Sequence, residues 1–295
     1  MEWKFKHSNL EYIFDHHNLP YVWNSSVLIR EWVGSFPKED TWVQKNLGIP
    51  SLFIRLDCVV REDGNIGLYE IEERPSGLST AKKINKRFSE TLAEVRKQWP
   101  EFKVLISSKR TGDDDWGWDI EKVTYEEALS SDSLLLIRAE PEELEYHAFE
   151  SRSISSLIQK GNKRYGLSMG LWKEVTLHDF DNFNWNKGFC LKPFVGSKCS
   201  DIEIWYPGLS AKDRKGSGAS SQNKIRETLE KNKSMFFQEF INPMISSNEE
   251  NMILRVFFLY NPKDKEYEYA GGFWNSRGTN FKIHGATDTT FGPVV

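Results

Sequence analysis

The sequence predicts a mixed α/β (α+β) protein, and three stretches support that prediction. Residues 51–72 hold two apolar, β-branched runs around Glu-Asp-Gly-Asn, which is the composition of a β-hairpin. Ser79–Trp99 repeats apolar residues at helical spacing and is followed by Pro100, a typical helix stop. Residues 252–274 again form two strand-like runs around a polar turn. Helices that alternate with short apolar strands favour a layered fold in which helices cover a sheet.

The composition is that of a soluble globular protein, with 39% hydrophobic and 28% charged residues in a chain of 295. This length allows one large or two ordinary domains. No apolar run approaches the ~20 residues of a membrane helix, and the first residues lack the apolar core of a signal peptide. Three scattered cysteines predict neither disulfides nor a zinc site, so we expect a reducing cytoplasm. A net charge of −4 argues against nucleic acid as the main partner.

Other segments are interpreted from their local patterns. Residues 102–107 and 133–138 are strand-like, and residues 124–129 between them are helix-like, which predicts a small α/β layer with parallel pairing. Residues 9–17 are interpreted as a short helix. Residues 208–224 are rich in Gly, Ser and Lys without apolar periodicity, so they are interpreted as a mobile loop, either a lid or a disordered insertion.

Charged residues gather on the hairpin of residues 51–72. Because side chains alternate along a strand, Arg55 and Asp57 share one face, and so do Glu70 and Glu72. If the two strands pair, three carboxylates and one guanidinium converge, and a hard divalent cation is the usual remedy for such crowding. The alternative is an ordinary polar hairpin face on which Arg55 pairs with Asp57 or Glu70.

Two basic residues lie within apolar, strand-like runs. Lys192 is followed by Pro193 and the small residues Gly196 and Ser197, an arrangement in which a fixed charge and backbone N–H groups can bind phosphate. The alternative is a lysine on an edge strand that reaches solvent. Arg255 lies in the middle of an apolar run, so it either faces outward or has a partner.

The hairpin pattern R-x-D followed by E-x-E-x-x-P-x-G resembles the metal-binding strand pair of ATP-grasp ligases. The resemblance implies that Asp57, Glu70 and Glu72 hold Mg²⁺ against the phosphates of ATP. Glu72 stands where the family usually has Asn, which adds one negative charge to the site. Arg55 and Arg277, the latter in a Gly/Asn-rich segment, are implied to stabilise the transferred phosphate.

The resemblance also implies a nucleotide site. The strand 234–241 resembles the family's hinge strand, which reads the adenine edge with side chains and backbone. The residues implied to bind ATP are Lys163, Lys192, Gly196, Ser197, Gln238, Glu239, Ile241 and Glu250.

These motifs occur in an unusual order, with the metal hairpin before the lysine strand. The chain therefore resembles circularly permuted ATP-grasp proteins similar to the catalytic domain of glutathionylspermidine synthases. Such a protein has two lobes around a nucleotide cleft, and here a small Rossmann-like α/β layer is added. Four parts are expected: residues 1–50 without an assigned role, 51–100 with the metal hairpin, 101–148 with the small layer, and 149–295 with the nucleotide-binding lobe. Permutation also predicts that residues 284–295 lie near residues 51–60.

We therefore expect an ATP- and Mg²⁺-dependent ligase that joins a carboxylate to an amine or thiol through an acyl phosphate. Small molecules or peptides would supply both groups, and the sequence indicates neither their identity nor the oligomeric state. Asp57→Asn or Glu70→Gln is expected to abolish turnover without unfolding the protein. The alternatives are a nucleotide-binding protein without ligase activity, a phosphotransferase on the same scaffold, and a metal-dependent nuclease-like site.

Overall fold

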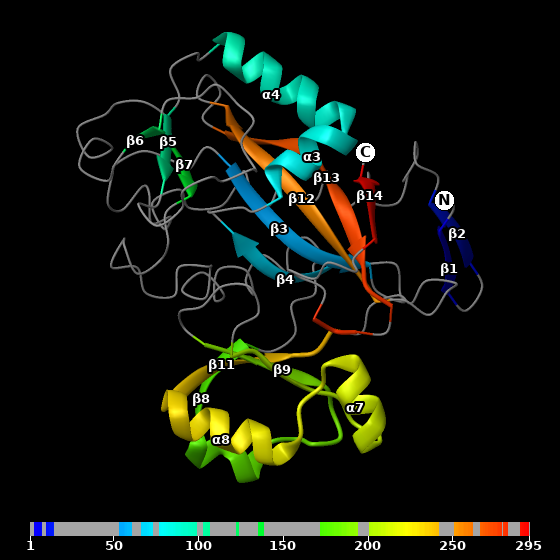
Figure 1. The fold of residues 1–295 in the computed structure, drawn as a ribbon, viewed down its shortest axis with the longest axis vertical. Coiled ribbons are helices and arrows are strands. Elements are labelled where there is room, and N and C mark those ends of the chain that lie inside the picture. The colour runs from blue at the N-terminus through cyan, green and yellow to red at the C-terminus, as the bar shows by residue number, and fades with distance from the viewer. Residues whose placement is uncertain are drawn as a thin grey trace.

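The structure, a computed structural model, describes residues 3–7, 10–14, 53–60, 66–72, 77–98, 103–106, 122–123, 135–138, 172–193, 201–241, 251–261, 266–278, 280–282 and 290–294. Mixed helices and mainly antiparallel sheets form an α+β fold, as the sequence predicts (Figure 1). No helix of this part of the chain is long and apolar enough to cross a membrane.

The main element is an antiparallel five-stranded sheet in the order β14-β13-β12-β3-β4. Its strands are β3 (Phe53–Val60), β4 (Ile66–Glu72), β12 (Met252–Asn261), β13 (Glu266–Ser276) and β14 (Thr290–Val294). The pairing of β3 with β4 and of β12 with β13 confirms both predicted hairpins. Together with the helices that cover it, this sheet is called the five-stranded unit below.

Two helices cover one face of this sheet. The single helix predicted at 79–99 is wrong, because α3 (Leu78–Ile84) and α4 (Lys86–Gln98) are separated at Asn85, whose backbone is extended. The Asn85 side chain donates to the carbonyls of Gly272 and Val294 and accepts from the amide of Phe88. The bonds to Gly272 and Val294 connect Asn85 to the sheet and stabilise the break between the two helices. The sequence at this break contains no Gly or Pro.

The core of the five-stranded unit lies between these helices and the sheet. Phe88 of α4 packs on Phe53 and Phe257 with ring centroids 5.7 and 5.3 Å apart. The remaining buried members of this cluster are Leu78, Ala81, Leu92, Leu259, Ala270 and Phe273. The apolar half of the sheet face is therefore the half that the helices cover.

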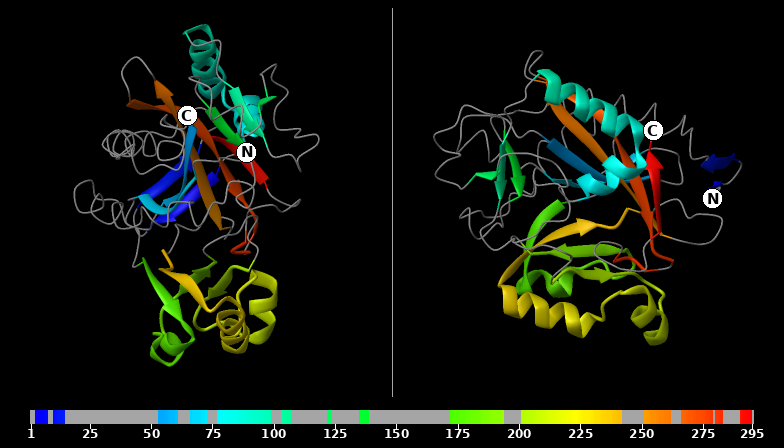
Figure 2. Two further views of the ribbon diagram at one scale, coloured as in Figure 1. Left: turned by 90° about the vertical axis from the view of Figure 1, so that its left-hand side faces the viewer. Right: turned by 45° about the horizontal axis from the view of Figure 1, so that its top comes forward.

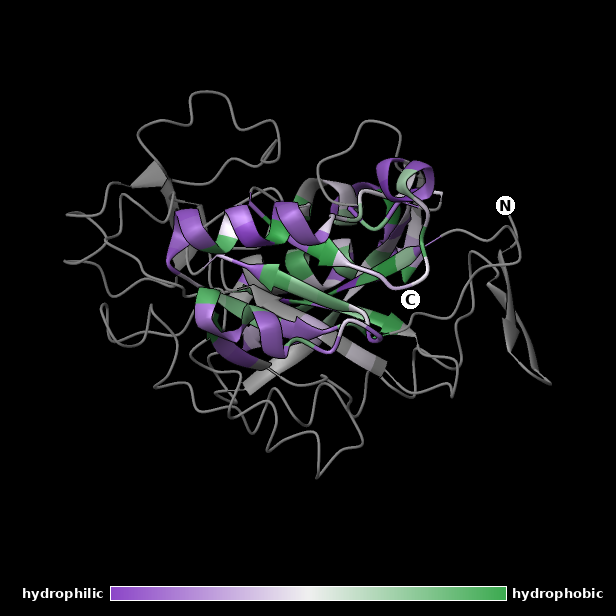
Figure 3. Cartoon of the chain, turned by 90° about the horizontal axis from the view of Figure 1, so that it is seen from below, coloured by the Kyte–Doolittle hydropathy of each residue, from purple (hydrophilic) through white to green (hydrophobic). Residues whose placement is uncertain are grey.

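A second antiparallel sheet has the order β10-β9-β11-β8. Its elements are β8 (Trp172–Thr176), η3 (Leu177–Asn182), β9 (Phe189–Lys192), β10 (Glu203–Trp205), α7 (Ala211–Ser217), α8 (Gln222–Asn232) and β11 (Ser234–Glu239). Aromatic residues fill the core between this sheet and its helices. Most residues of α8 are hydrophilic, and the helix is buried through Ile225, Thr228 and Leu229 (Figure 3). This group is called the four-stranded unit, and it lies below β4 in Figures 1 and 2.

The loop predicted at 208–224 is wrong, because the segment contains α7 and the first turn of α8. The Ser210 and Ser221 side chains cap the two helices by accepting amide N–H bonds, and Gly218 ends α7 with φ +73°. The guanidinium of Arg214 lies 4.3 Å from the centroid of the Trp205 ring. Caps and this cation–π contact, instead of an apolar stripe, define helix α7.

Two small sheets complete the described structure. Strands β5 (Lys103–Ile106), β6 (Lys122–Val123) and β7 (Leu135–Arg138) pair in parallel, which confirms the parallel pairing predicted between 102–107 and 133–138. Strands β1 (Trp3–His7) and β2 (Leu10–Phe14) form a hairpin, so the helix predicted at 9–17 is wrong. Leu10, Tyr12 and Phe14 alternate along β2, and this period of two favours a strand.

The C-terminal strand belongs to the same sheet as the N-terminal part of the predicted hairpin. Strand β14 pairs with β13, and β12 lies between β13 and β3. Residues 290–294 and 53–60 therefore share one sheet but are not neighbours in it. Residues 284–289 lie outside the described part of the chain.

Candidate functional site

The helix-covered face of the five-stranded sheet changes from apolar to polar along β3. Phe53 belongs to the core, whereas Arg55 and Asp57, at the next two positions on the same face, are buried charged residues. Asp57 lies opposite Arg255 of β12 on one side and opposite Glu70 of β4 on the other. The pairing of strands distant in sequence thus gathers charges that the sequence places far apart.

Asp57 holds two guanidinium groups. Its carboxylate accepts from Arg55 Nε at 2.6 Å and from Arg55 Nη2 at 2.9 Å, and Arg255 Nε lies 3.7 Å from its Oδ2. Arg55 is 1% exposed, and Asp57 and Arg255 are each 5% exposed. Charge-assisted, bidentate contacts of this kind fix the Arg55 and Asp57 side chains.

The Arg55–Asp57 contact is the one that the alternative interpretation of the hairpin predicts, although the pair is buried and does not lie on a solvent face. Glu70 and Glu72 occupy the register positions opposite Asp57 and Arg55. Of the three predicted metal ligands, the structure describes the side chain of Asp57. The side chains of Glu70 and Glu72 are not among the described ones. Among the described residues, no group of three or more His, Cys, Asp or Glu could hold a metal ion.

Two further polar residues of this face escaped the sequence-based assignment. Arg255 is the partner of Asp57, and its guanidinium lies 5.8 Å from the centroid of the Phe273 ring. Asn275, two residues beyond Phe273 on β13, is 6% exposed. The sequence feature that could have identified Arg255 is a charged residue within an apolar strand. Asn275 could have been identified because it lies two positions after Phe273, on the same face of the strand.

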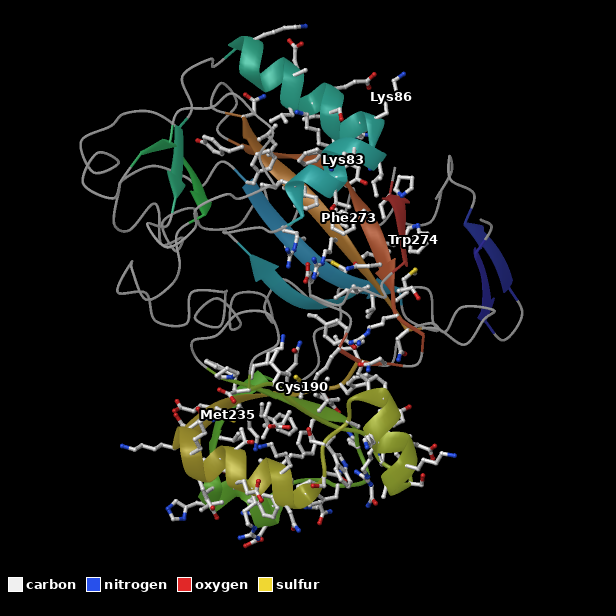
Figure 4. All side chains as sticks on the ribbon, in the orientation of Figure 1. Lys83, Lys86, Cys190, Met235, Phe273 and Trp274 are labelled. Atoms are coloured by element: carbon white, nitrogen blue, oxygen red, sulfur yellow. The ribbon has the colours of Figure 1, made fainter. Side chains whose placement is uncertain are left out.

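The four-stranded unit turns a second set of predicted residues toward the five-stranded unit. Phe189 and Leu191 of β9 belong to the aromatic core, so Cys190 and Lys192 project from the opposite face of the sheet. Figure 4 shows Cys190 on the side of this unit that lies toward the five-stranded sheet, which carries Phe273 and Trp274. Lys192 is only 7% exposed on an inner strand, so the alternative of a solvent-reaching edge lysine is wrong.

These residues converge on Tyr69 of β4. Lys192 Nζ and Gln238 Nε2 donate to the Tyr69 carbonyl at 3.4 and 3.3 Å, and the Tyr69 hydroxyl donates to the carbonyl of Ile241 at 2.6 Å. Burial, reinforced by nearby Cys190, raises the pKa of the Tyr69 phenol far above its ordinary value, although the bond to Ile241 opposes this shift. Three of the residues predicted to bind ATP thus contact the residue that precedes Glu70.

The remaining predicted residues are not at this junction or are not described. Glu239 pairs with Lys187 at 3.1 Å, and both side chains are substantially exposed. The half-buried Arg277 donates from Nη1 to the carbonyl of Lys282 at 2.7 Å. Outside the described residues lie Lys163, Gly196, Ser197 and Glu250.

The segment after β13 also joins the two units. The amide of Phe281 donates to the carbonyl of Ser217 at 2.8 Å, and Asn280 Nδ2 donates to the carbonyl of Gly216 at 3.3 Å. The Phe281 ring packs on Tyr206, with ring centroids 5.2 Å apart, and Tyr206 packs on Phe240 at 5.5 Å. Contacts from both ends of the five-stranded unit therefore fix the four-stranded unit beside the charged cluster.

Comparison with solved structures gives a structural likeness, whereas comparison with sequences gives no match. No protein-family model matches the chain, and no curated protein matches it. Among solved structures, the chain is similar to a protein described as "Putative gamma-glutamylcysteine synthetase" from Methylobacillus flagellatus KT, with 9% sequence identity and a TM-score of 0.47. The match covers 100% of this chain and 90% of that one.

Proposed function

We propose that the protein is an ATP- and Mg²⁺-dependent ligase that joins a carboxylate to an amine through an acyl phosphate. The observation that carries the proposal is the contact of Lys192 with the carbonyl of Tyr69, 123 residues away in the sequence. This contact brings a buried cation of the four-stranded unit next to Glu70. A metal-bound triphosphate is bound by carboxylates that hold the metal ion and by fixed cations close to the phosphates. A buried lysine beside a strand that carries carboxylates suits this arrangement.

In this proposal the two units are the two lobes of a permuted ATP-grasp fold, and the nucleotide lies between them. Lys192 neutralises phosphate charge, and Gln238 with the backbone at Ile241 binds the base. Arg55 and Arg255 stabilise charge on the transferred group, because fixed guanidiniums in a buried site need no reorganisation. The substrates are small-molecule or peptide carboxylates and amines, and the proposed location is the cytoplasm.

Asp57, with Glu70 and Glu72, would hold Mg²⁺. The donor set fits this ion, because Mg²⁺ prefers carboxylate oxygens. Asp57 accepts two hydrogen bonds from Arg55, and its carboxylate has about four lone-pair sites, so it retains acceptor capacity. Bound Mg²⁺ would neutralise phosphate charge during transfer.

A thermal-shift panel of nucleotides with and without Mg²⁺ tests binding, and ADP release against pooled amino acids, peptides and polyamines tests turnover. Lys192→Met should lower ADP release ~10²–10³-fold, because one fixed charge in a site of this kind contributes that much. Lys231→Met is the matched control, since Lys231 is exposed on the same unit and pairs with Asp201, and it should leave turnover unchanged. Failure of every nucleotide to stabilise the protein would contradict the proposal.

A second candidate is a nucleotide-binding protein without ligase activity. Two features favour it. Glu72 stands at a position where ATP-grasp ligases usually have Asn, and Arg55 donates two hydrogen bonds to the Asp57 carboxylate. Glu72 changes the charge and the metal preference of the site, and Arg55 competes with a metal ion for the Asp57 carboxylate. Stabilisation by ATP without ADP release in any substrate pool would select this candidate. ADP release without an amide or thioester product would indicate a phosphotransferase.

A further inference from the structure

Asn275 presents a buried hydrogen-bond acceptor beside the charged cluster. Its Oδ1 is fully enclosed and has no hydrogen-bond partner among the described residues. Asn275 faces the same side of the sheet as Phe273, over whose ring Arg255 lies. A buried acceptor without a partner costs free energy in the folded protein, so a ligand that donates to it would recover that cost.

The chemistry of an amide oxygen restricts what this ligand is. Phosphate dianions and carboxylates only accept hydrogen bonds, so Asn275 Oδ1 cannot bind them through that atom. Arg255 and Arg55, which only donate, suit those groups instead. The partner of Oδ1 is therefore a metal ion or an N–H or O–H group.

Distance excludes the metal ion of the proposed site. Asp57 is opposite Arg255, Arg255 is opposite Phe273, and Asn275 lies two residues further along β13. Strand spacing and rise put the Asp57 and Asn275 Cα atoms about 12 Å apart. Ligand oxygens of one Mg²⁺ are at most about 4 Å apart, so the two side chains cannot share the ion. N–H and O–H donors are therefore left. Since the proposal assigns the base of ATP to Gln238 and the backbone at Ile241, the donor of the reaction that still needs a partner beside Arg255 is the attacking amine.

We propose that Asn275 binds the attacking amine and favours an amine over a thiol, an inference that rests on the proposed ligase function. The amine nitrogen attacks the acyl carbon, the bond from that carbon to the phosphate oxygen breaks, and the phosphate leaves with the electron pair. The nitrogen loses one proton, which the released phosphate takes up as HPO₄²⁻. Asn275 is neutral and orients the nitrogen through an N–H bond. A thiol, with one weak S–H donor, gains little from this acceptor.

Stability of the ligand-free protein gives the first test, and it does not depend on activity. Asn275→Leu keeps the size of the side chain and removes the acceptor without a partner. We expect the melting temperature to rise by about 2–4 °C. Asn186→Leu, on an exposed turn of the four-stranded unit, is the matched control and should change it little. A fall for Asn275→Leu would show a structural hydrogen bond and overturn the inference.

Amine binding and turnover give the second test. Hydroxylamine and methoxyamine, which are largely uncharged at neutral pH, should stabilise the wild-type protein in thermal shift and should not stabilise Asn275→Leu. With hydroxylamine as nucleophile and an amino-acid mixture as carboxylate source, Asn275→Leu should raise the amine KM about tenfold and leave the ATP KM within about twofold. Equal loss with hydroxylamine and with capture by 2-mercaptoethanol, a thiol without an amine, would overturn the selectivity. If no pool supports ADP release while amine stabilisation still depends on Asn275, the ligase proposal fails and the amine site stands. If neither amine stabilises the wild type, the inference fails.

Discussion

Gly218 lies against Asn280 so closely that a Cβ atom on the glycine would come within 2.9 Å of Asn280 Oδ1. Gly218 ends helix α7 of the four-stranded unit, and Asn280 follows the last strand residues of β13 in the five-stranded unit. The same asparagine donates to the carbonyl of Gly216. The two units therefore meet at a point where a single methyl group has no room.

Gly218→Ala should destabilise the protein by about 1–3 kcal/mol, because the position has φ +73° and the added Cβ meets Asn280. Gly216→Ala is the matched control two residues earlier in the chain. It lies within α7 with open space around its missing Cβ, so it should stabilise by about 0.5–1 kcal/mol. Chemical denaturation of both variants checks the pair, and equal effects would contradict the close approach.

Asp57→Asn should reduce stability as well as turnover. The structure changes the expectation from sequence that the fold stays intact, because the variant removes the negative charge that two buried guanidiniums contact. Removing one partner of a buried pair costs about 3–5 kcal/mol. Glu94→Gln provides the control, since its pair with Lys97 is exposed and should contribute at most about 1 kcal/mol. Urea denaturation measures both, and similar small changes would show that the cluster is not a stabilising unit.

Asn85→Ala should cost about 2–4 kcal/mol, since it leaves the carbonyls of Gly272 and Val294 and the amide of Phe88 without this partner. Hydrogen exchange should locate the loss at the start of α4 and at β14. Asn186→Ala, on an exposed turn, should have little effect. Unchanged protection at β14 would mean that Asn85 does not hold the terminal strand.

Stability should fall in alkaline solution through two buried acids. Burial, with the nearby Asp57 carboxylate adding to it, raises the pKa of the Cys58 thiol, and burial raises the pKa of the Tyr69 phenol. The unfolded chain ionises at about pH 8.5 for Cys and pH 10 for Tyr, so this stability is complete below those values and is lost as pH rises above them. Each group should contribute a slope of about 1.4 kcal/mol per pH unit.

Cys58→Ala separates the two contributions. The variant should keep constant stability from pH 8 to about pH 10, where the wild type already declines, and then decline with Tyr69. Denaturant midpoints across this range provide the measurement. Identical profiles for the variant and the wild type would show that Cys58 does not control the alkaline loss.

Local pattern predicted the elements whose signals are local. The turn residues and alternation of 51–72 predicted the hairpin, and the apolar context of Lys192 indicated its burial. The break at Asn85 carries no Gly or Pro, and its cause is the set of bonds to Gly272 and Val294 far along the chain. The cap that Asn85 gives to the Phe88 amide is a local signal, whereas the bonds to Gly272 and Val294 cannot be read from a local pattern.

The candidate site shows the same division. The grouping of Arg55 with Asp57 follows from strand alternation, whereas Arg255 joins them only because β12 pairs with β3. Sequence spacing gave no register between strands that are nearly two hundred residues apart. Helix α7 is a different case, because its cap residues Ser210 and Gly218 can be recognised in the sequence. The segment is nevertheless predicted as a loop because it lacks apolar residues at helical spacing.

The order of strands in the five-stranded sheet affects how the protein is made on the ribosome. The edge of β3 that finally pairs with β12 stays without its partner until residue 261 has been synthesised, which takes roughly 10–40 s after β3 at 5–20 residues per second. During that interval the hairpin has an open edge on which another chain can pair. The yield of folded protein in the cell should therefore depend on how quickly translation reaches the last strands.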